Sequence, residues 1–158
     1  MNQQYTIRLA TQADALAVNN LSDQTGLSDG SENHAKLEPM NDLHTWIVAE
    51  DNSSQIVGAA YFGLETHSDR VWNLYFLAVL PNTQGAGIGS GLVAWAEANL
   101  KNRGQAVAKL LVIETSSVES FAPTRAFYQK QGYLEEARVR EYYGAGDDKV
   151  IFWKLLHP

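Results

Sequence analysis

A glycine-rich segment near the middle of the chain joins a strand-like run to a helical pattern. Val71 to Val79 is rich in β-branched and aromatic residues, and the segment 81–90 that follows carries Gly85, Gly87 and Gly89. Glycine permits a tight turn and a close approach of a ligand to the backbone, and the first turn of a helix presents N–H groups that have no acceptor within the helix. The segment therefore predicts a strand-to-helix turn that binds an anion such as a diphosphate.

Two common phosphate-binding motifs fit this segment badly. In the dinucleotide pattern G-x-G-x-x-G, counted from Gly85 and Gly87, the third glycine position is occupied by Ser90. The P-loop pattern requires a lysine after its last glycine, and the segment contains none. Another kind of phosphate-bearing ligand is needed.

The rest of the chain has a pattern typical of a mixed α/β fold. Thr11 and Asp14 have capping-box spacing and predict a helix over residues 12–23, whereas 26–42 fits a loop and a short helix equally well. The other expected elements are strands at 46–50, 56–64, 71–79, 107–114, 133–142 and 150–156, a helix after the glycine segment that stops at Gly104, and a helix from Pro123 to Gly132. This order predicts one α/β domain over residues 1–158, with helices flanking a mixed sheet.

Composition excludes several classes of protein. The chain has no cysteine, which removes thiolate metal sites and cysteine nucleophiles, and its four histidines lack paired spacing, so we expect no metal. The net charge of −6 disfavours nucleic-acid binding, and its distribution (3 − 10 = −7 up to residue 70, 9 − 8 = +1 beyond) allows an acidic rim that attracts cations. No run of 18 apolar residues predicts a membrane span, so we expect a cytoplasmic protein.

The glycine segment also carries a family resemblance. Gln84, Gly87 and Gly89 reproduce the (Arg or Gln)-x-x-Gly-x-(Gly or Ala) pattern of the GNAT N-acyltransferase superfamily. Three further landmarks resemble that family in the same order: Leu77-Ala78-Val79, Ile113-Glu114-Thr115, and Phe127-Tyr128 before Gly132-Tyr133. The resemblance implies a central, mostly antiparallel sheet that is splayed between its fourth and fifth strands, and it implies acetyl-CoA as cosubstrate.

The resemblance also implies which residues contact the coenzyme. The candidates are the end of a strand and the loop after it: Leu77, Ala78, Val79, Gln84, Gly85, Ala86, Gly87, Ile88, Gly89 and Ser90. Loop amides would hold the diphosphate, and a backbone N–H near Leu77 or Val79 would stabilise the oxyanion. The chain departs from the family at Phe121, where many relatives carry an asparagine that contacts the coenzyme arm; Ser117 and Ser120 are weak substitutes.

Two side chains are candidates for proton transfer. Glu114 ends a predicted apolar strand and matches the base of relatives that acetylate protein N-termini, although a carboxylate at a strand end is often simply exposed to water. Tyr128 is the candidate general acid because a phenol still holds its proton at pH 7. On an amphipathic helix a tyrosine commonly packs in the core, and Phe127 beside it is expected to be core.

The acceptor is less well defined. Tyr142 and Tyr143 resemble the segment where N-terminal acetyltransferases shape their peptide pocket, although paired tyrosines near a hairpin turn often only pack, and Asp147-Asp148 fits a turn rather than a cation site. The prediction is direct acetyl transfer to a small-molecule amine or a peptide N-terminus. A catalytically silent acyl-CoA sensor is the alternative, a dehydrogenase a distant third, and a homodimer using exposed aromatics such as Trp153 stays open.

Overall fold

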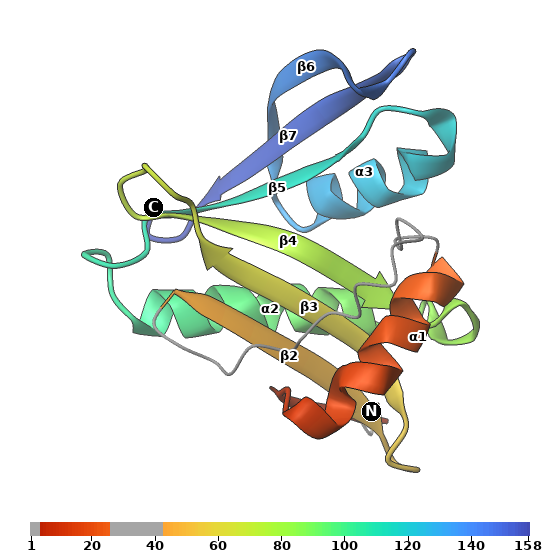
Figure 1. Ribbon diagram of the computed structural model, residues 1–158. Helices are drawn as coiled ribbons and strands as arrows, with labels where there is room; N and C mark the ends of the chain where they lie inside the picture. The colour runs from red at the N-terminus through yellow and green to blue at the C-terminus, as the bar shows by residue number, and fades with distance from the viewer. Residues whose placement is uncertain (1–3, 26–42) are drawn as a thin grey trace. The chain divides into compact units, whose positions relative to one another are not determined.

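The computed structural model describes residues 4–25 and 43–158 (Figure 1). The chain divides into two compact units, Met1–Gly63 with Tyr75–Asn99 and Leu64–Leu74 with Leu100–Pro158. The strands are β1 (Tyr5–Leu9), β2 (His44–Asp51), β3 (Ile56–Leu64), β4 (Val71–Val79), β5 (Leu110–Ser116), β6 (Leu134–Gly144) and β7 (Asp147–Leu155). The α-helices are α1 (Ala15–Thr25), α2 (Ile88–Asn102) and α3 (Ala122–Lys130), and three single 3-10 turns are η1 (Gln12–Asp14), η2 (Pro81–Thr83) and η3 (Glu119–Phe121).

The strands form a seven-stranded mixed sheet in the order β1-β2-β3-β4-β5-β7-β6. β4 and β5 are parallel, whereas the β1–β2, β2–β3, β5–β7 and β6–β7 pairs are antiparallel. The parallel register runs from Val71 with Leu110 to Leu74 with Ile113, although β4 continues to Val79 and β5 to Ser116. This arrangement confirms the predicted fold class, with pairing between the fourth and fifth strands that ends partway along both.

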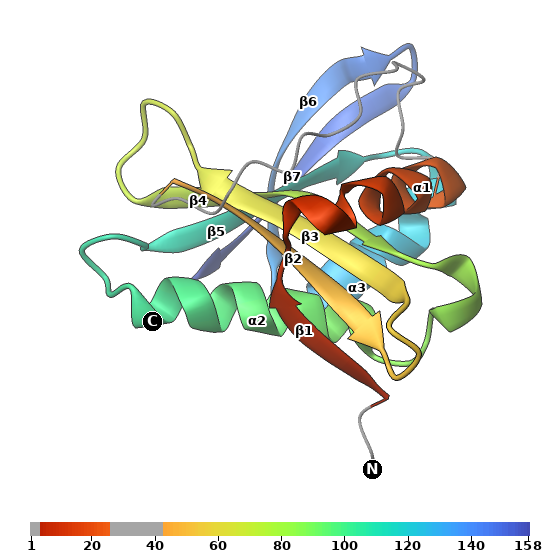
Figure 2. The same ribbon diagram turned by 60° about the horizontal axis from the view of Figure 1, so that its bottom comes forward.

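In the first unit, helices cover both faces of β1–β3 (Figures 1 and 2). α2 packs closely on β3, because a Cβ at Gly58 would lie 2.8 Å from Cγ2 of Ile88 and 3.1 Å from Cδ1 of Leu92. α1 lies on the opposite face and buries Val18 and Leu21. Glycine at position 58 therefore lets the helix that follows the glycine segment sit directly on the sheet.

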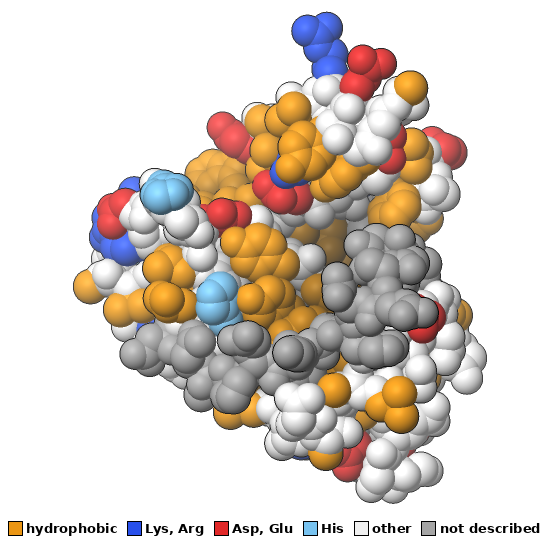
Figure 3. Space-filling model, in the orientation of Figure 1, with side chains coloured by type: hydrophobic (Ala, Val, Ile, Leu, Met, Phe, Trp, Pro, Cys, Tyr) orange, Lys and Arg blue, Asp and Glu red, His pale blue; other side chains and the backbone are white. Residues whose placement is uncertain are grey.

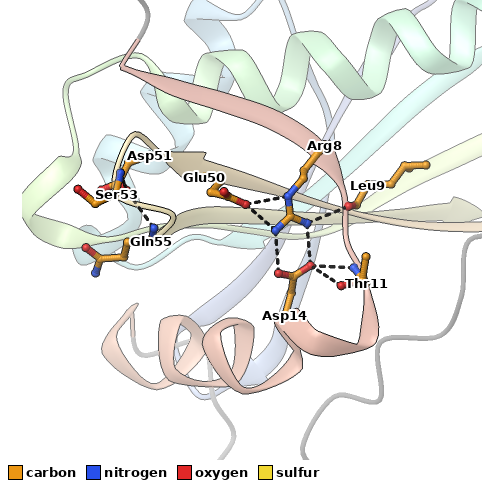
Figure 4. A network of polar contacts seen from close by, with 8 residues as sticks. All are labelled: Arg8, Leu9, Thr11, Asp14, Glu50, Asp51, Ser53 and Gln55. Atoms are coloured by element: carbon orange, nitrogen blue, oxygen red, sulfur yellow. Dashed lines mark hydrogen bonds and ion pairs between the residues drawn. The ribbon is translucent and has the colours of Figure 1, made fainter.

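A polar network joins β1, η1 and β2 in this unit (Figure 4). The Arg8 guanidinium donates to both carboxylate oxygens of Asp14, at 2.8 and 2.9 Å, and to Glu50 at 2.8 Å. The Thr11 N–H donates to the Asp14 carboxylate at 2.7 Å, so the predicted capping box is present. The hydrogen bond from Arg8 holds the pKa of the buried Asp14 below its usual value.

In the second unit, β5 and β7 carry the core, and α3 packs on β7 through aromatic rings. Ile113 and Phe152 are fully buried, and the Tyr128 ring lies 6.0 Å from Phe152 and 6.3 Å from Tyr133, measured between centroids. β6 is exposed along all of its eleven residues. The outer strand of the β6–β7 hairpin therefore contributes no buried side chain.

Several predicted elements differ from the structure. β1 was not predicted, because five residues with mixed polarity carry little periodic signal. The predicted strand 107–114 begins later, at Leu110, because Val107 and Ala108 are held in a turn by N–H donation to Gly104 O. The expected burial of Phe127 was wrong: Tyr128 is the buried residue of that pair and Phe127 is half-buried. Residues 26–42, where a loop and a helix fitted equally, lie outside the described residues.

Candidate active site

The glycine segment forms an exposed turn between η2 and α2. Gly85 has φ = 88° and Gly87 has φ = 81°, values that L-residues with a side chain rarely adopt. A Cβ at Gly85 would meet nothing within 4 Å, and one at Gly87 would meet only Tyr5 Oη at 3.9 Å. The first bond into the helix runs from Gly91 N–H to Gly87 O at 2.9 Å, so the amides of Ile88 and Gly89 have no acceptor within α2.

Two residues that the sequence did not point to hold this turn in place. Tyr5, on β1, donates its hydroxyl to Gly87 O at 2.9 Å. Gly91 allows this contact, because a Cβ there would lie 2.6 Å from Tyr5 Oη and 3.1 Å from Cδ1 of Ile7. Neither residue carries a local signal, since their contact depends on β1 lying beside α2 in the folded chain.

The last residues of β4 lead into the turn. Ala78 is buried and Leu77 and Val79 are half-buried, while Gln84 lies on the exposed turn and donates Nε2 to Val79 O at 3.4 Å. The structure thus brings the predicted coenzyme contacts of β4 and of the turn together in the first unit. It places Gln84 against the end of β4, where its amide links the two segments.

Aromatic rings gather on β2, β3 and β4 just before these residues. Trp46 stacks on Tyr61 with ring centroids 4.8 Å apart, and Phe76 lies 5.5 Å from Trp46 and Tyr75 5.7 Å from Tyr61. Consecutive residues of a regular strand point to opposite faces. Because Tyr75 and Phe76 both join one cluster, β4 leaves strict alternation immediately before Leu77.

In the second unit, Glu114 lies within β5 rather than at its end, since Thr115 and Ser116 continue the strand. Its carboxylate is paired with an ammonium: Lys149 Nζ lies 3.2 Å from Glu114 Oε2. Lys149 precedes Ile151, the register partner of Glu114, by two residues, so the pair is a diagonal cross-strand contact. The Glu114 side chain is 29% exposed and ion-paired, and the sequence did not predict its pairing with Lys149.

Tyr142 and Tyr143 lie beside this ion pair on an irregular stretch of β6. The register between β6 and β7 shifts between Val139 and Gly144, and Glu141 has φ = 53°. The Tyr142 ring centroid is 3.8 Å from Lys149 Nζ, and the two tyrosine rings meet edge to face at 5.1 Å. Partial burial of its hydroxyl-bearing ring is the largest cause that raises the pKa of Tyr143. Both residues remain about half exposed.

Hydrogen bonds fix the hairpin against the end of β5. Asp148 accepts from the Glu141 N–H at 2.9 Å, and the Asp148 N–H donates to Ser117 Oγ at 2.8 Å. Ser116 donates its hydroxyl to Asp147. Asp147 and Asp148 thus stabilise the turn, as the sequence indicated. Ser117 accepts a hydrogen bond from the hairpin. Ser120 is exposed and Phe121 is half-buried, and both lie in η3.

Tyr128 is 6% exposed and lies among aromatic rings. Burial raises the pKa of its phenol well above the ordinary value. The side chain therefore holds its proton throughout the neutral range.

Trp153, expected as an exposed aromatic, is instead half-buried with its indole Nε1 buried.

Two further properties concern residues 4–25 and 43–158 only. No group of three or more His, Asp or Glu side chains in these ranges is arranged to hold a metal ion. No helix in the same ranges has the length and apolar character that crossing a bilayer requires.

Comparison with known families gives a direct identification. The family described as the acetyltransferase (GNAT) domain matches residues 42–135, more than half of the chain. The chain therefore belongs to the GNAT acetyltransferase family. A search of curated proteins found no match.

Solved structures agree with this assignment. A protein from Desulfovibrio desulfuricans assigned to the GNAT family is 27% identical, with a TM-score of 0.84 over 96% of this chain and 99% of that one. The ribosomal-protein-S18-alanine N-acetyltransferase from Escherichia coli has 20% identity and a TM-score of 0.73, over 96% of this chain and 94% of that one. An aminoglycoside 6'-N-acetyltransferase complexed with coenzyme A has 19% identity and a TM-score of 0.75, over 97% and 98%. The last two show the fold alone.

Proposed function

We propose that residues 1–158 form one acyl-CoA N-acyltransferase domain that transfers the acetyl group of acetyl-CoA to a primary amine by direct attack. The acceptor is a small-molecule amine or a peptide N-terminus. The observation that carries the proposal is the open turn at Gly85 and Gly87, with its left-handed backbone, ahead of the amides of Ile88 and Gly89. The absence of cysteine fits direct attack, without a covalent thioester on the enzyme, and a reducing cytoplasmic location.

The turn fits the diphosphate of the coenzyme. A Cβ at Gly85 would meet no atom within 4 Å, so there is open space beside the backbone of the turn. The amides at the N-terminus of the helix carry partial positive charge, which favours an anion. In the proposal, the amides from Gln84 to Ser90 hold the diphosphate, and Leu77, Ala78 and Val79 contact the arm that carries the thioester. The interrupted alternation at Tyr75 and Phe76 supports an oxyanion role for a nearby N–H, because such irregularities remove a residue from regular pairing.

Glu114 is the proposed base. A lysine-like amine has a pKa of about 10.4, so forming its neutral state at pH 7 costs roughly 4.6 kcal/mol. The amine nitrogen attacks the thioester carbonyl, the C–N bond forms, the C–S bond breaks, and Glu114 takes a proton from the nitrogen directly or through water. In the free protein this carboxylate lies 3.2 Å from Lys149 Nζ, so the acceptor nitrogen would approach Glu114 beside that ion pair.

Tyr128 is proposed to assist the departing sulfur. Its raised pKa makes complete proton transfer to a thiolate unfavourable, since an ordinary thiol has a pKa of about 8.5. A hydrogen bond from the phenol needs no such transfer and still stabilises the negative charge that develops on sulfur. In this proposal Tyr128 acts chiefly as a hydrogen-bond donor to the leaving group, and the released thiolate takes its proton from water to give the free thiol.

A mass-spectrometric screen tests the function. Acetyl-CoA is incubated with the full chain and a panel of polyamines, amino acids, antibiotics and peptide N-termini, and acetylated product and free thiol are measured together. We expect amine-dependent release of thiol that falls by roughly 10²–10⁴-fold in Glu114→Gln. Acetyl-CoA binding without thiol release for any amine would favour a coenzyme sensor instead.

A further inference from the structure

The proposed base, Glu114, lies beside the ammonium group of Lys149 in the free protein. Lys149 Nζ lies 3.2 Å from Glu114 Oε2 and 3.8 Å from the centroid of the Tyr142 ring. Carboxylates and the faces of aromatic rings both bind alkylammonium ions in proteins. The side chains of Glu114 and Tyr142, here called the ammonium site, therefore have the composition of a cation-binding site.

The site binds its ammonium in the charged form. Burial lowers the pKa of Lys149, but hydrogen bonds to Tyr142 and Glu114 outweigh it, so the net shift is upward. The Lys149 side chain is 12% exposed, whereas that of Glu114 is 29% exposed and the Tyr142 residue is 56% exposed. Glu114 and Tyr142 are thus more exposed to solvent than the Lys149 side chain that contacts them.

Hydrogen bonds other than those of Lys149 hold together the segments that carry the ammonium site. The hydrogen bonds of Asp148 to Glu141 and to Ser117 tie the hairpin to the end of β5. Figure 3 shows hydrophobic, basic and acidic side chains gathered over the β6–β7 hairpin. The segments that carry Glu114 and Tyr142 are therefore tied together by hydrogen bonds that do not involve the Lys149 side chain.

We propose that the ammonium site recognises the acceptor, and that Lys149 fills it until an acceptor ammonium displaces the lysine. This proposal rests on the proposed acetyl transfer and narrows its substrate to an unbranched primary alkylamine. The reason is that the Lys149 group in the site is a –CH₂–NH₃⁺ at the end of a straight alkyl chain, and this group contacts both Glu114 and Tyr142. The same chemistry is carried by a lysine side chain of a peptide and by a free linear diamine, whereas a peptide α-amine adjoins a branched carbon.

Binding without coenzyme tests the proposal independently of catalysis. The full chain is titrated calorimetrically with 1,5-diaminopentane, with Nα-acetyl-lysine amide and with an alanyl dipeptide. If Lys149 fills the site nine-tenths of the time, its removal raises apparent affinity about tenfold. We therefore expect Lys149→Met to bind the first two probes about tenfold more tightly than the wild type, with no gain for the dipeptide; the stronger of the two identifies the source of the amine.

Matched variants complete the test. Lys154→Met removes another lysine of β7, whose ammonium lies 5.3 Å from the Tyr133 ring centroid and donates to a carbonyl, and should give no gain. Adding Tyr142→Leu to Lys149→Met should cancel the gain. Lys149→Gln repeats the measurement if the methionine variant does not fold. Equal affinities in the wild type and both Lys149 variants, or an equal gain for the dipeptide, would overturn the proposal. Tight binding without acetyl transfer would instead overturn the proposed reaction.

Discussion

Gly85 and Gly104 provide a matched pair that separates backbone strain from coenzyme binding. Their φ angles are 88° and 89°, and a Cβ at either position would meet nothing within 4 Å. Alanine at such a φ costs about 1–2 kcal/mol, partly offset by about 0.4–1 kcal/mol of lost freedom in the unfolded chain. Each substitution therefore carries a net cost of about 1 kcal/mol.

We expect this cost to lower the Tm of the Gly104 variant but not that of the Gly85 variant. Gly104 donates its N–H to Lys101 O and accepts from Val107 and Ala108, so its conformation is fixed. No hydrogen bond among residues 4–25 and 43–158 involves Gly85, so an alanine there can relax. Gly104→Ala should lower Tm by roughly 2–4 °C. Gly85→Ala should leave Tm nearly unchanged, because its turn relaxes in the free protein.

Coenzyme binding must then restore the turn in Gly85→Ala. The offset from the unfolded chain does not enter binding to the folded protein, so the strain of about 1–2 kcal/mol corresponds to roughly 5–30-fold weaker binding, measured calorimetrically with coenzyme A. Gly104→Ala should bind with the wild-type affinity. Equal affinity in Gly85→Ala and the wild type would refute the assignment of this turn to the coenzyme, and an unchanged Tm in Gly104→Ala would refute the strain argument itself.

Three other substitutions test separate parts of the structure. Arg8→Met leaves the buried Asp14 carboxylate without its cation and should cost about 2 kcal/mol in chemical denaturation at pH 7. Because the pKa of Asp14 is lowered in the folded state, this difference should be complete above its ordinary pKa of 3.8 and shrink as the pH falls further; a constant difference down to pH 2 contradicts the network. Tyr5→Phe removes the donor to Gly87 O and should weaken coenzyme binding several-fold with little change in Tm, so an intact affinity would make this contact dispensable. Tyr128→Phe should lower kcat while coenzyme affinity stays nearly the same, and an unchanged kcat would remove the phenol from the reaction.

Local patterns in the sequence were sufficient for most elements of the fold. The runs around Ile56–Leu64 and Val71–Val79 and the helix after the glycine segment were predicted because their periodicity arises from short-range geometry. β1 was missed for the same reason, since a short strand of mixed polarity is stabilised by its neighbour β2 rather than by its own pattern.

By itself, the sequence determined the glycine turn and the order of its flanking elements. Backbone conformations that favour glycine, and capping contacts such as that of Thr11 with Asp14, act over only a few residues. Only the tertiary structure decided which distant groups meet: Tyr5 with Gly87, 82 residues apart, and Glu114 with Lys149 through a diagonal contact between β5 and β7. Such pairs depend on strand register and helix packing, which arise from the folded chain as a whole and leave no trace in local spacing.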